Sequence, residues 1–161
     1  MVPKFENEYA FLSNFYVADF TWRNNVFASG EHAFQAAKAY HIADSYIGDM
    51  AGYFDSVVNA PTPAKAKYAG RSVKIDVKSW DAQKVTYMRE IVHAKFSDVP
   101  GLAGKLINTG AMMLVEGNDW GDVFWGRSRN AEGRMVGFNT LGTILMEERG
   151  YWLHSDFGDK K

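Results

Sequence analysis

The chain contains no cysteine, so it can form no disulfide, offer no thiol nucleophile and bind no metal through thiolate. It has no apolar run that approaches the roughly 20 residues of a membrane-spanning helix. Its first residues also lack the basic start and apolar core of a signal peptide. We therefore expect a cytoplasmic protein with no membrane attachment.

Neither sign of charge dominates, because 18 basic and 19 acidic side chains give a formal net charge of −1. Nonspecific binding to duplex nucleic acid needs a basic face, which this balance disfavours, although a small basic patch is compatible with it. The 161 residues show no internal repeat, low-complexity stretch or linker. This length and composition predict one globular domain over residues 1–154 and a polar C-terminal tail over residues 155–161.

Sequence patterns for several common chemistries are missing. The four histidines do not pair at metal-ligand spacing, and no His-Glu-x-x-His sequence occurs. Glycine-rich phosphate loops and the Gly-x-Ser-x-Gly elbow are absent as well. Carboxylate chemistry remains, and the sequence predicts no metal site.

Glycines, tryptophans and carboxylates gather in the C-terminal part of the chain. Residues 116–126 read EGNDWGDVFWG, and residues 137–149 read GFNTLGTILMEER. Glycines let backbone approach a ligand, tryptophans offer stacking faces, and carboxylates hold or move protons. Together with Glu31, this composition favours a polar, ring-containing substrate.

Hydrophobic periodicity and turn residues predict a helix-rich α+β fold without a βαβ rhythm. A hairpin is expected over residues 20–27, where Asn24 and Asn25 separate two short apolar runs. Helix starts are expected at Ser29, Thr62-Pro63 and Asn139, and helix ends at Gly70, Gly110 and Gly150. Expected helices cover residues 29–38, 44–54, 63–70, 79–96, 102–108 and 139–150. A short strand or extended segment is expected over 73–77, and strands are expected over 112–115 and 123–125.

The candidate acids each allow two interpretations. Glu31 follows a capping serine by two residues, so it either carries chemistry or only favours the helix dipole. Lys38 lies two turns further on roughly the same face, so an anion could bridge the two side chains in a cleft. Asp122 is either a partly buried acid that takes part in the chemistry or a residue that closes a turn.

The candidate binding residues are equally open. Trp80 and Trp125 are either core residues or stacking platforms. Arg71, just past an expected helix end, binds an anion or only neutralises the helix dipole. These residues alone do not separate an enzyme from a binding module.

Short motifs follow one another in an order that is more specific than any one of them. They begin with FLSNF at residues 11–15 and SGEHAFQAAK at residues 29–38. They continue with Pro63-Ala-Lys65, Gly70-Arg71, Trp80, Met88, Lys95-Phe96, Thr109-Gly110, Leu114-Val-Glu116, Asp122, Trp125-Gly126, Asn139-Thr-Leu-Gly142, Leu145-Met146 and Arg149. This set, from Tyr9 to Arg149, resembles the NADAR family, also called YbiA-like.

The resemblance implies a compact, helix-rich α+β domain linked to NAD or ADP-ribose metabolism, in a family of N-glycosidases. Some members hydrolyse ribosylamino-pyrimidinone phosphates of riboflavin biosynthesis, and others remove ADP-ribose from guanine in nucleic acid. Both substrates carry a nitrogen on ribosyl C1 and a 5′ phosphate. Three hypotheses follow: a hydrolase of the small phosphate, a hydrolase of ADP-ribosylated guanine, and a non-catalytic reader of ADP-ribose.

Given the resemblance, we expect Glu31 to be the carboxylate near the ribose and Asp122 to be its partner. Cleavage of a ribosyl C–N bond passes through an oxocarbenium-like transition state, which a carboxylate stabilises. An inverting mechanism needs the two carboxyl groups roughly 6.5–9.5 Å apart, and a covalent mechanism needs about 5 Å. The sequence leaves both mechanisms open.

The other expected site residues bind the substrate. Aromatic rings stack on the base, cations bind phosphate, and amides bond base or ribose edges, although Asn139 is equally suited to cap a helix. These residues are Trp125 with Trp80 or Phe15, then Lys38 and Arg71, then Asn14 and Asn139. No metal or organic cofactor is expected. The expected partner is a small ribosyl phosphate or an ADP-ribose-containing substrate, with ADP-ribosylated nucleic acid as the larger alternative.

One segment departs from the family pattern. Residues 127–137 read RSRNAEGRMVG and carry three arginines where the family has a short glycine-rich link. The segment is either a basic lip over a larger, phosphate-bearing ligand or a solvated loop. The first interpretation slightly favours ADP-ribosylated guanine as the substrate.

Overall fold

The computed structural model describes residues 1–46 and 48–158, which form two compact units. One unit comprises Asn14–Val99, and the other combines Met1–Ser13 with the chain from Pro100 onward. Helices dominate and the strands are short, which confirms the helix-rich α+β class. No helix in these described ranges has the length and apolar character needed to cross a membrane. The single domain over residues 1–154 stays a prediction.

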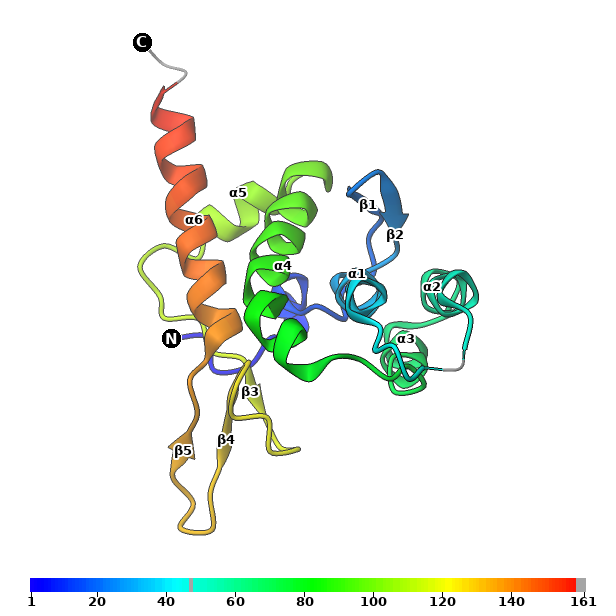
Figure 1. Ribbon diagram of the computed structural model, residues 1–161. Helices are drawn as coiled ribbons and strands as arrows, with labels where there is room; N and C mark the ends of the chain where they lie inside the picture. Colours follow the sequence, from blue (N-terminus) through cyan, green and yellow to red (C-terminus); the bar gives the residue numbers. More distant parts are fainter. Residues whose placement is uncertain (47, 159–161) are drawn as a thin grey trace. The chain divides into compact units, whose positions relative to one another are not determined.

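The Asn14–Val99 unit contains one hairpin and a set of packed helices (Figure 1). Its elements are β1 (Phe20–Trp22), β2 (Asn25–Phe27), α1 (Gly30–Ala36), η2 (Ala37–His41), α2 (Met50–Val58), α3 (Pro63–Ala69) and α4 (Val77–Asp98). The helices α1, α2 and α3 pack on one another, and α1 also packs on α4. Every residue of α1 is buried, so this short helix is the centre of the unit.

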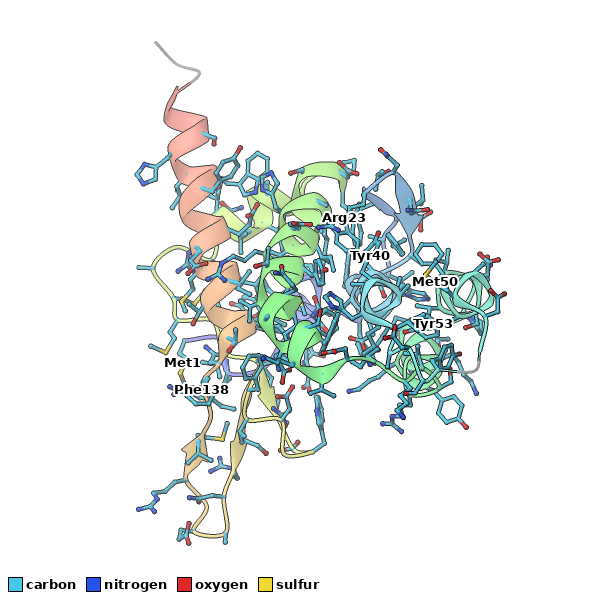
Figure 2. All side chains as sticks on the ribbon, viewed as in Figure 1. Met1, Arg23, Tyr40, Met50, Tyr53 and Phe138 are labelled. Carbon is cyan, nitrogen blue, oxygen red and sulfur yellow. The ribbon has the colours of Figure 1, made fainter. Side chains whose placement is uncertain are left out.

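The predicted hairpin over residues 20–27 is confirmed. β1 and β2 pair antiparallel, with Phe20 opposite Phe27. Arg23 and Asn24 form the turn with φ of 49° and 64°, the left-handed conformation of a two-residue type I′ turn. The Arg23 guanidinium lies 5.3 Å from the ring centroid of Tyr40, and Figure 2 shows the two side chains close together. This contact helps to hold an arginine in a conformation that is unusual for its type.

Two predicted caps begin helices as expected. The Ser29 hydroxyl accepts a hydrogen bond from the backbone N–H of His32 at the start of α1. The Thr62 hydroxyl accepts one from the backbone N–H of Lys65, and Pro63 occupies the start of α3. Each hydroxyl satisfies a backbone donor that has no partner within its own helix.

The helix predicted over residues 44–54 begins later than expected. Asp49 accepts hydrogen bonds from the backbone N–H groups of Ala51 and Gly52, so α2 starts directly after it. An aspartate cap is a stronger start signal than the apolar residues that precede it. Residue 47 of the predicted stretch lies outside the described ranges.

α4 confirms the longest predicted helix, and its buried residues are Trp80, Tyr87, Met88, Ile91, Val92, Lys95 and Phe96. The extended segment predicted over residues 73–77 contributes only one bridge, between Ile42 and Ile75. Asp76 accepts a hydrogen bond from the backbone N–H of Ser79 and so begins α4 at residue 77. The last residue of the predicted segment, Val77, therefore belongs to α4.

The second unit combines helices with a small sheet. Its elements are η1 (Asn7–Leu12), α5 (Leu102–Ile107), β3 (Gly117–Asn118), β4 (Arg127–Arg129), β5 (Met135–Val136) and α6 (Thr140–Gly158). β3 pairs parallel with β4, and β4 pairs antiparallel with β5. In Figure 1, β4 and β5 form a hairpin that leads into α6. Most of the segment Arg127–Gly137 therefore forms a hairpin of this sheet.

Two of the predicted strands in this unit are wrong. Residues 112–115 contribute only an isolated bridge, between Val2 and Leu114. Residues 123–125 belong to an irregular loop, because the Asp122 carboxylate accepts hydrogen bonds from the backbone N–H groups of two of them. Those N–H groups are then unavailable to a neighbouring strand.

The last helix begins near the predicted residue but does not end at Gly150. α6 continues to Gly158, so Gly150 lies inside it. A single glycine within a helix costs only about 1 kcal/mol relative to alanine, so the helix-forming residues on both sides outweigh its stop signal. The tail predicted over residues 155–161 is helical as far as residue 158, and residues 159–161 lie outside the described ranges.

Candidate functional site

The Glu31 carboxyl group lies inside the Asn14–Val99 unit, in the first turn of α1, and its side chain is only 7% exposed. The backbone N–H of Glu31 donates to the carbonyl of Asn14, with N and O 2.9 Å apart. Gly30 permits this close approach, because a Cβ there would lie 2.8 Å from the Asn14 Oδ1 atom. The start of α1 is thus anchored against the residue before Phe15, and it carries the carboxyl group into the interior.

Gln35 follows Glu31 by one helical turn and contacts it directly. Its Nε2 atom donates to the Glu31 Oε1 atom across 2.7 Å. The Gln35 side chain is 6% exposed, and its Oε1 atom has no hydrogen-bond partner among the residues that the structure describes. Gln35 lies in the motif over residues 29–38, but the motif alone predicts no role for it. The i, i+4 spacing from Glu31 was the signal that could have found it.

Three of the basic side chains in this unit are relevant to the site. Lys38 in η2 donates from Nζ to the carbonyl of Gly70 across 3.1 Å. Arg71 follows that glycine at the end of α3 and is exposed. Lys67 lies one turn earlier in α3, with Nζ 5.9 Å from the ring centroid of Phe15. The sequence interpretation missed Lys67, although its i, i+4 spacing from Arg71 predicts neighbouring cations.

Burial and charge shift the pKa values of the central pair of ionisable groups. Burial raises the pKa of Glu31, while the hydrogen bond from Gln35 and the charges of Lys67 and Lys38 act against that rise. Burial lowers the pKa of Lys38; the Glu31 charge opposes this change, and the charge of Arg71 adds to it. Burial thus disfavours the charged form of both side chains, and their mutual attraction opposes that effect.

Asn14 and Phe15, both predicted to bind substrate, are adjacent to the start of α1. The Asn14 Nδ2 atom points to the Met88 sulfur across 3.3 Å, and its backbone carbonyl holds Glu31. Phe15 is 42% exposed, so part of its ring remains accessible for stacking. Their positions are compatible with the predicted roles.

Trp80 was predicted to stack on the substrate base, which requires an accessible ring, but this residue is buried. Its buried ring packs in an aromatic cluster, with centroids 5.1 Å from Phe34, 5.7 Å from His41 and 6.0 Å from Tyr87. A ring enclosed in this way has no face left for a substrate base. The structure therefore assigns Trp80 to the core, which was the other interpretation of this residue.

Asp122 and Trp125 lie in the second unit, in the loop after β3. The Asp122 Oδ1 atom accepts hydrogen bonds from the backbone N–H groups of Phe124, across 3.0 Å, and Trp125, across 2.9 Å. Asn118 holds the same loop, because its side chain donates to the Asp122 carbonyl and accepts from the Asp122 N–H. One carboxylate oxygen of Asp122 thus closes a turn. Trp125 is half-buried and packs edge-on against Phe124.

The Asn139 side chain forms hydrogen bonds with the protein's own backbone. Its Oδ1 atom accepts from the backbone N–H of Glu116, its Nδ2 atom donates to the carbonyl of Leu114, and both distances are 2.9 Å. The first N–H groups of α6 donate instead to the carbonyls of Phe124 and Trp125. Asn139 therefore neither caps α6 with its side chain nor offers an open amide to a ligand. Its φ of 55° explains why asparagine suits this position.

Replacing Asn139 with alanine should lower the free energy of unfolding by about 2–4 kcal/mol, measured by urea titration. The change removes two hydrogen bonds of the Asn139 side chain and leaves alanine in a left-handed conformation that asparagine tolerates better. Asn139→Gly is the matched control, because it removes the same bonds but tolerates the conformation. We expect glycine to lose less stability than alanine. Wild-type stability in both variants would contradict this structural role.

The predicted site residues fall into both units. The Asn14–Val99 unit contains Asn14, Phe15, Glu31, Lys38, Arg71 and the buried Trp80, and the second unit contains Asp122, Trp125 and Asn139. Asp119, another acid of the glycine-rich segment, forms a surface ion pair with Lys4 across 2.7 Å. Within the described ranges, no cluster of three or more His, Asp or Glu side chains could hold a metal ion. The partnership of Glu31 with Asp122 stays a prediction.

Three relatives resemble this chain along most of its length. N-glycosidase YbiA of Shigella flexneri serotype 5b (strain 8401) is 29% identical over 144 residues, which cover 89% of this chain and 81% of the relative. N-glycosidase R617 of Acanthamoeba polyphaga mimivirus is 30% identical over 131 residues, covering 76% and 73%. Riboflavin biosynthesis protein VVA0006 of Vibrio vulnificus (strain YJ016) is 32% identical over 145 residues, covering 89% of this chain and 36% of that protein.

A solved structure and a family model agree with these similarities. The NMR structure of the E. coli protein YbiA matches 98% of this chain and 89% of its own, with a TM-score of 0.74 and 27% sequence identity. Residues 3–151 match the NADAR domain. The family predicted from the ordered motifs is thereby confirmed. The chain belongs to the NADAR domain family, and its fold is YbiA-like.

Proposed function

We propose that this protein is an N-glycosidase, a hydrolase that cleaves the bond between ribosyl C1 and a nitrogen atom of its substrate. Family membership supports the proposal, as do two relatives that bear the name N-glycosidase. The observation that carries it is the buried Glu31 carboxyl group, which the Gln35 amide holds at 2.7 Å. A buried carboxyl group of this kind is the group that such a reaction needs beside the sugar.

Cleavage of the C1–N bond leaves positive charge on C1 and the ring oxygen of the ribose. An ionised Glu31 stabilises that charge and accepts a proton from the water that attacks C1. The base nitrogen takes the bonding electrons and leaves with a proton, so water adds across the broken bond. Burial raises the pKa of Glu31 and makes it a stronger base than an exposed glutamate. Asp122 is the proposed partner for the second proton transfer.

The first candidate substrate is a phosphorylated ribosylamino-pyrimidinone or a guanine-like ribosyl phosphate. Lys38 and Arg71, together with Lys67, supply positive charge for the 5′ phosphate, and guanidinium suits bidentate contact. Phe15 and Trp125 offer ring faces for the base. The similarity to a protein named for riboflavin biosynthesis supports the pyrimidinone.

A side-by-side hydrolysis assay with mass-spectrometric detection tests the proposal. One reaction contains the ribosylamino-pyrimidinone phosphate, and the other contains ADP-ribosylated guanine in an oligonucleotide. Release of ribose 5-phosphate and free base in the first reaction alone is the expected result. Release of ADP-ribose with an intact oligonucleotide would move the substrate to the second class. If neither reaction yields product and the protein binds ADP-ribose measurably, the proposed enzymatic activity is wrong and a non-catalytic reader is favoured.

One feature of the second unit favours ADP-ribosylated guanine as the second candidate substrate. The β4–β5 hairpin carries Arg129 and Arg134, both exposed, and Phe138 follows it with 77% of its surface exposed. Figure 2 shows Phe138 where the hairpin leads into α6. Exposed cations with a nearby aromatic ring are the combination that binds the backbone and bases of single-stranded nucleic acid.

If the hairpin contacts a nucleic-acid substrate, Arg134→Ala should weaken binding to the modified oligonucleotide and lower the salt dependence of log K by about one unit. Hydrolysis of the small phosphate should stay unchanged, because that substrate carries no extended backbone. Glu132→Ala, in the same turn and of opposite charge, is the control and should strengthen oligonucleotide binding slightly. Equal salt slopes for wild type and both variants would exclude the hairpin as a nucleic-acid contact.

A further inference from the structure

The Gln35 side chain is the polar group that directly contacts the Glu31 carboxyl group on α1. The two residues are one helical turn apart, both are almost fully buried, and Nε2 and Oε1 are 2.7 Å apart. A buried carboxylate is costly unless a donor meets it. Gln35 supplies that donor from the interior of the same helix, so the orientation of the carboxyl group depends on the orientation of the amide.

The other end of the same amide is unsatisfied. Gln35 Oε1 is buried and accepts no hydrogen bond from the described part of the chain. An amide carries both a donor and an acceptor, so rotation by half a turn would present this oxygen to Glu31. The nitrogen suits an ionised Glu31, and the oxygen suits a protonated one. Gln35 can therefore bond Glu31 in either protonation state.

Neighbouring helices hold the Gln35 backbone and leave space for its side-chain amide. The Tyr53 hydroxyl of α2, labelled in Figure 2, donates to the Gln35 backbone carbonyl across 2.6 Å. On α3, a Cβ at Gly70 would lie only 1.9 Å from Gln35 Oε1. Gly70 has a right-handed helical conformation that any residue adopts, so space for the amide is the reason for a glycine here. Helices on both sides thus leave room for the amide beside the carboxyl group.

We propose that Gln35 is a positioning residue for Glu31: its amide orients the carboxyl group and can pair with both its ionised and its protonated form. This inference rests on the proposed function, in which Glu31 acts at the ribose. The other charged or titratable groups that act on Glu31 are Lys67 from α3, Lys38 from η2 and His32 from α1. None of them replaces the amide as the direct 2.7 Å donor to Glu31 Oε1.

Gln35→Met tests the proposal, because methionine has a similar length and no strong donor. We expect kcat to fall about tenfold with little change in KM, since the amide acts through Glu31 and does not bind substrate. The acid limb of the kcat–pH profile should move to higher pH, because the bond that favours the carboxylate is lost. Carbon-13 NMR titration of the Glu31 side chain should show the same upward movement without any substrate.

Gly70→Ala provides a second variant that retains Gln35. Its new methyl group should displace the amide and move the Glu31 titration in the same direction as Gln35→Met. Tyr53→Phe is the matched control, because it removes the hydrogen bond to the Gln35 backbone and leaves the amide untouched. It should lower stability and leave the Glu31 titration at its wild-type position.

The outcomes separate this proposal from the proposed function. An unchanged Glu31 titration in both Gln35→Met and Gly70→Ala would overturn the positioning role, whatever the enzyme hydrolyses. An equal movement in Tyr53→Phe would also overturn it, because general loosening of α1 would then explain the effect. If the titration moves as expected but the protein hydrolyses neither substrate, Gln35 still positions Glu31, and the proposed function is the part that fails.

Discussion

Glu31→Gln should lower the rate of N-glycoside hydrolysis by about 10²- to 10⁴-fold, the usual contribution of one acid–base group. Glutamine has nearly the same shape as glutamate and can still bond the Gln35 amide, so the start of α1 should remain intact. It cannot carry the negative charge that stabilises an oxocarbenium ion, and it cannot take a proton from water. Substrate affinity should therefore be retained while kcat falls.

The same substitution should raise stability at neutral pH. Burial raises the folded-state pKa of Glu31 above its unfolded value of about 4.3, so the folded protein favours the protonated form. The stability associated with this group is fully present below the unfolded pKa and is lost as pH rises through the folded pKa. Glutamine is always neutral and avoids that loss. Urea titration should show the gain at pH 7 and little difference near pH 4.

The pH dependence of the wild-type enzyme follows from the same shift. Because the ionised form of Glu31 acts, activity should fall as pH drops through the raised pKa of Glu31, above the range of an exposed glutamate. Glu132→Gln, an exposed hairpin residue, is the control and should change neither the rate nor this limb. Full hydrolysis by Glu31→Gln would remove Glu31 from the reaction. A non-catalytic reader would show no change in its binding function.

Local signals in the sequence were sufficient where one side chain determines the structure. Ser29 and Thr62 each satisfy a backbone N–H at a helix start. The hairpin over residues 20–27 was predicted with Asn24 and Asn25 between its apolar runs, and in the structure Arg23 and Asn24 form the turn, one position earlier. These predictions depend on neighbours within four positions in the chain. Glu31 is different, because the residues alone left its role open between chemistry and the helix dipole, and the family resemblance selected it. The burial of every residue of α1 is seen only in the structure.

Two of the failures, at Asn139 and Trp80, came from interactions between distant residues. Asn139 was assigned to a cap or a ligand, but its amide bonds the backbone at Leu114 and Glu116, more than twenty positions earlier. A tryptophan at position 80 is compatible both with the core and with stacking on a substrate. Only the packing of other rings around Trp80 shows that it belongs to the core. No pattern in the sequence reports such contacts.

Gln35 and Lys67 were missed for a different reason. Both lie at i, i+4 spacing from a residue that was chosen, Glu31 and Arg71 respectively, so the information was present. The sequence analysis selected side chains that could react with or bind a substrate directly. It did not consider side chains that act by contacting such a residue. The buried contact at 2.7 Å makes the role of Gln35 evident.

Asp122→Asn should reduce hydrolysis by about 10²-fold or more with little loss of stability. Asparagine keeps the Oδ1 atom that accepts from the backbone N–H groups of Phe124 and Trp125, so the turn should remain closed. The substitution removes only the ability of this side chain to ionise and to transfer a proton. Steady-state rates, together with urea unfolding of the same preparation, measure the two effects separately.

Asp122→Ala is the matched comparison, because it removes the charge and both hydrogen bonds. Its free energy of unfolding should fall by about 1–3 kcal/mol, since each backbone bond contributes about 0.5–1.5 kcal/mol. If asparagine retains full activity and alanine loses it, Asp122 only closes the turn, and its role as an acid is wrong. If asparagine already loses activity, the carboxylate itself takes part in the reaction.

The double variant Glu31→Gln with Asp122→Asn then tests whether the two carboxylates act in one step. If two residues act in one step, replacing both lowers the rate little more than replacing one. If they act independently, the two rate reductions multiply. We expect the double variant to be close to the more damaged single variant. Fully multiplicative losses would mean that Asp122 contributes to another step, such as binding of the base, and that Glu31 needs a different partner.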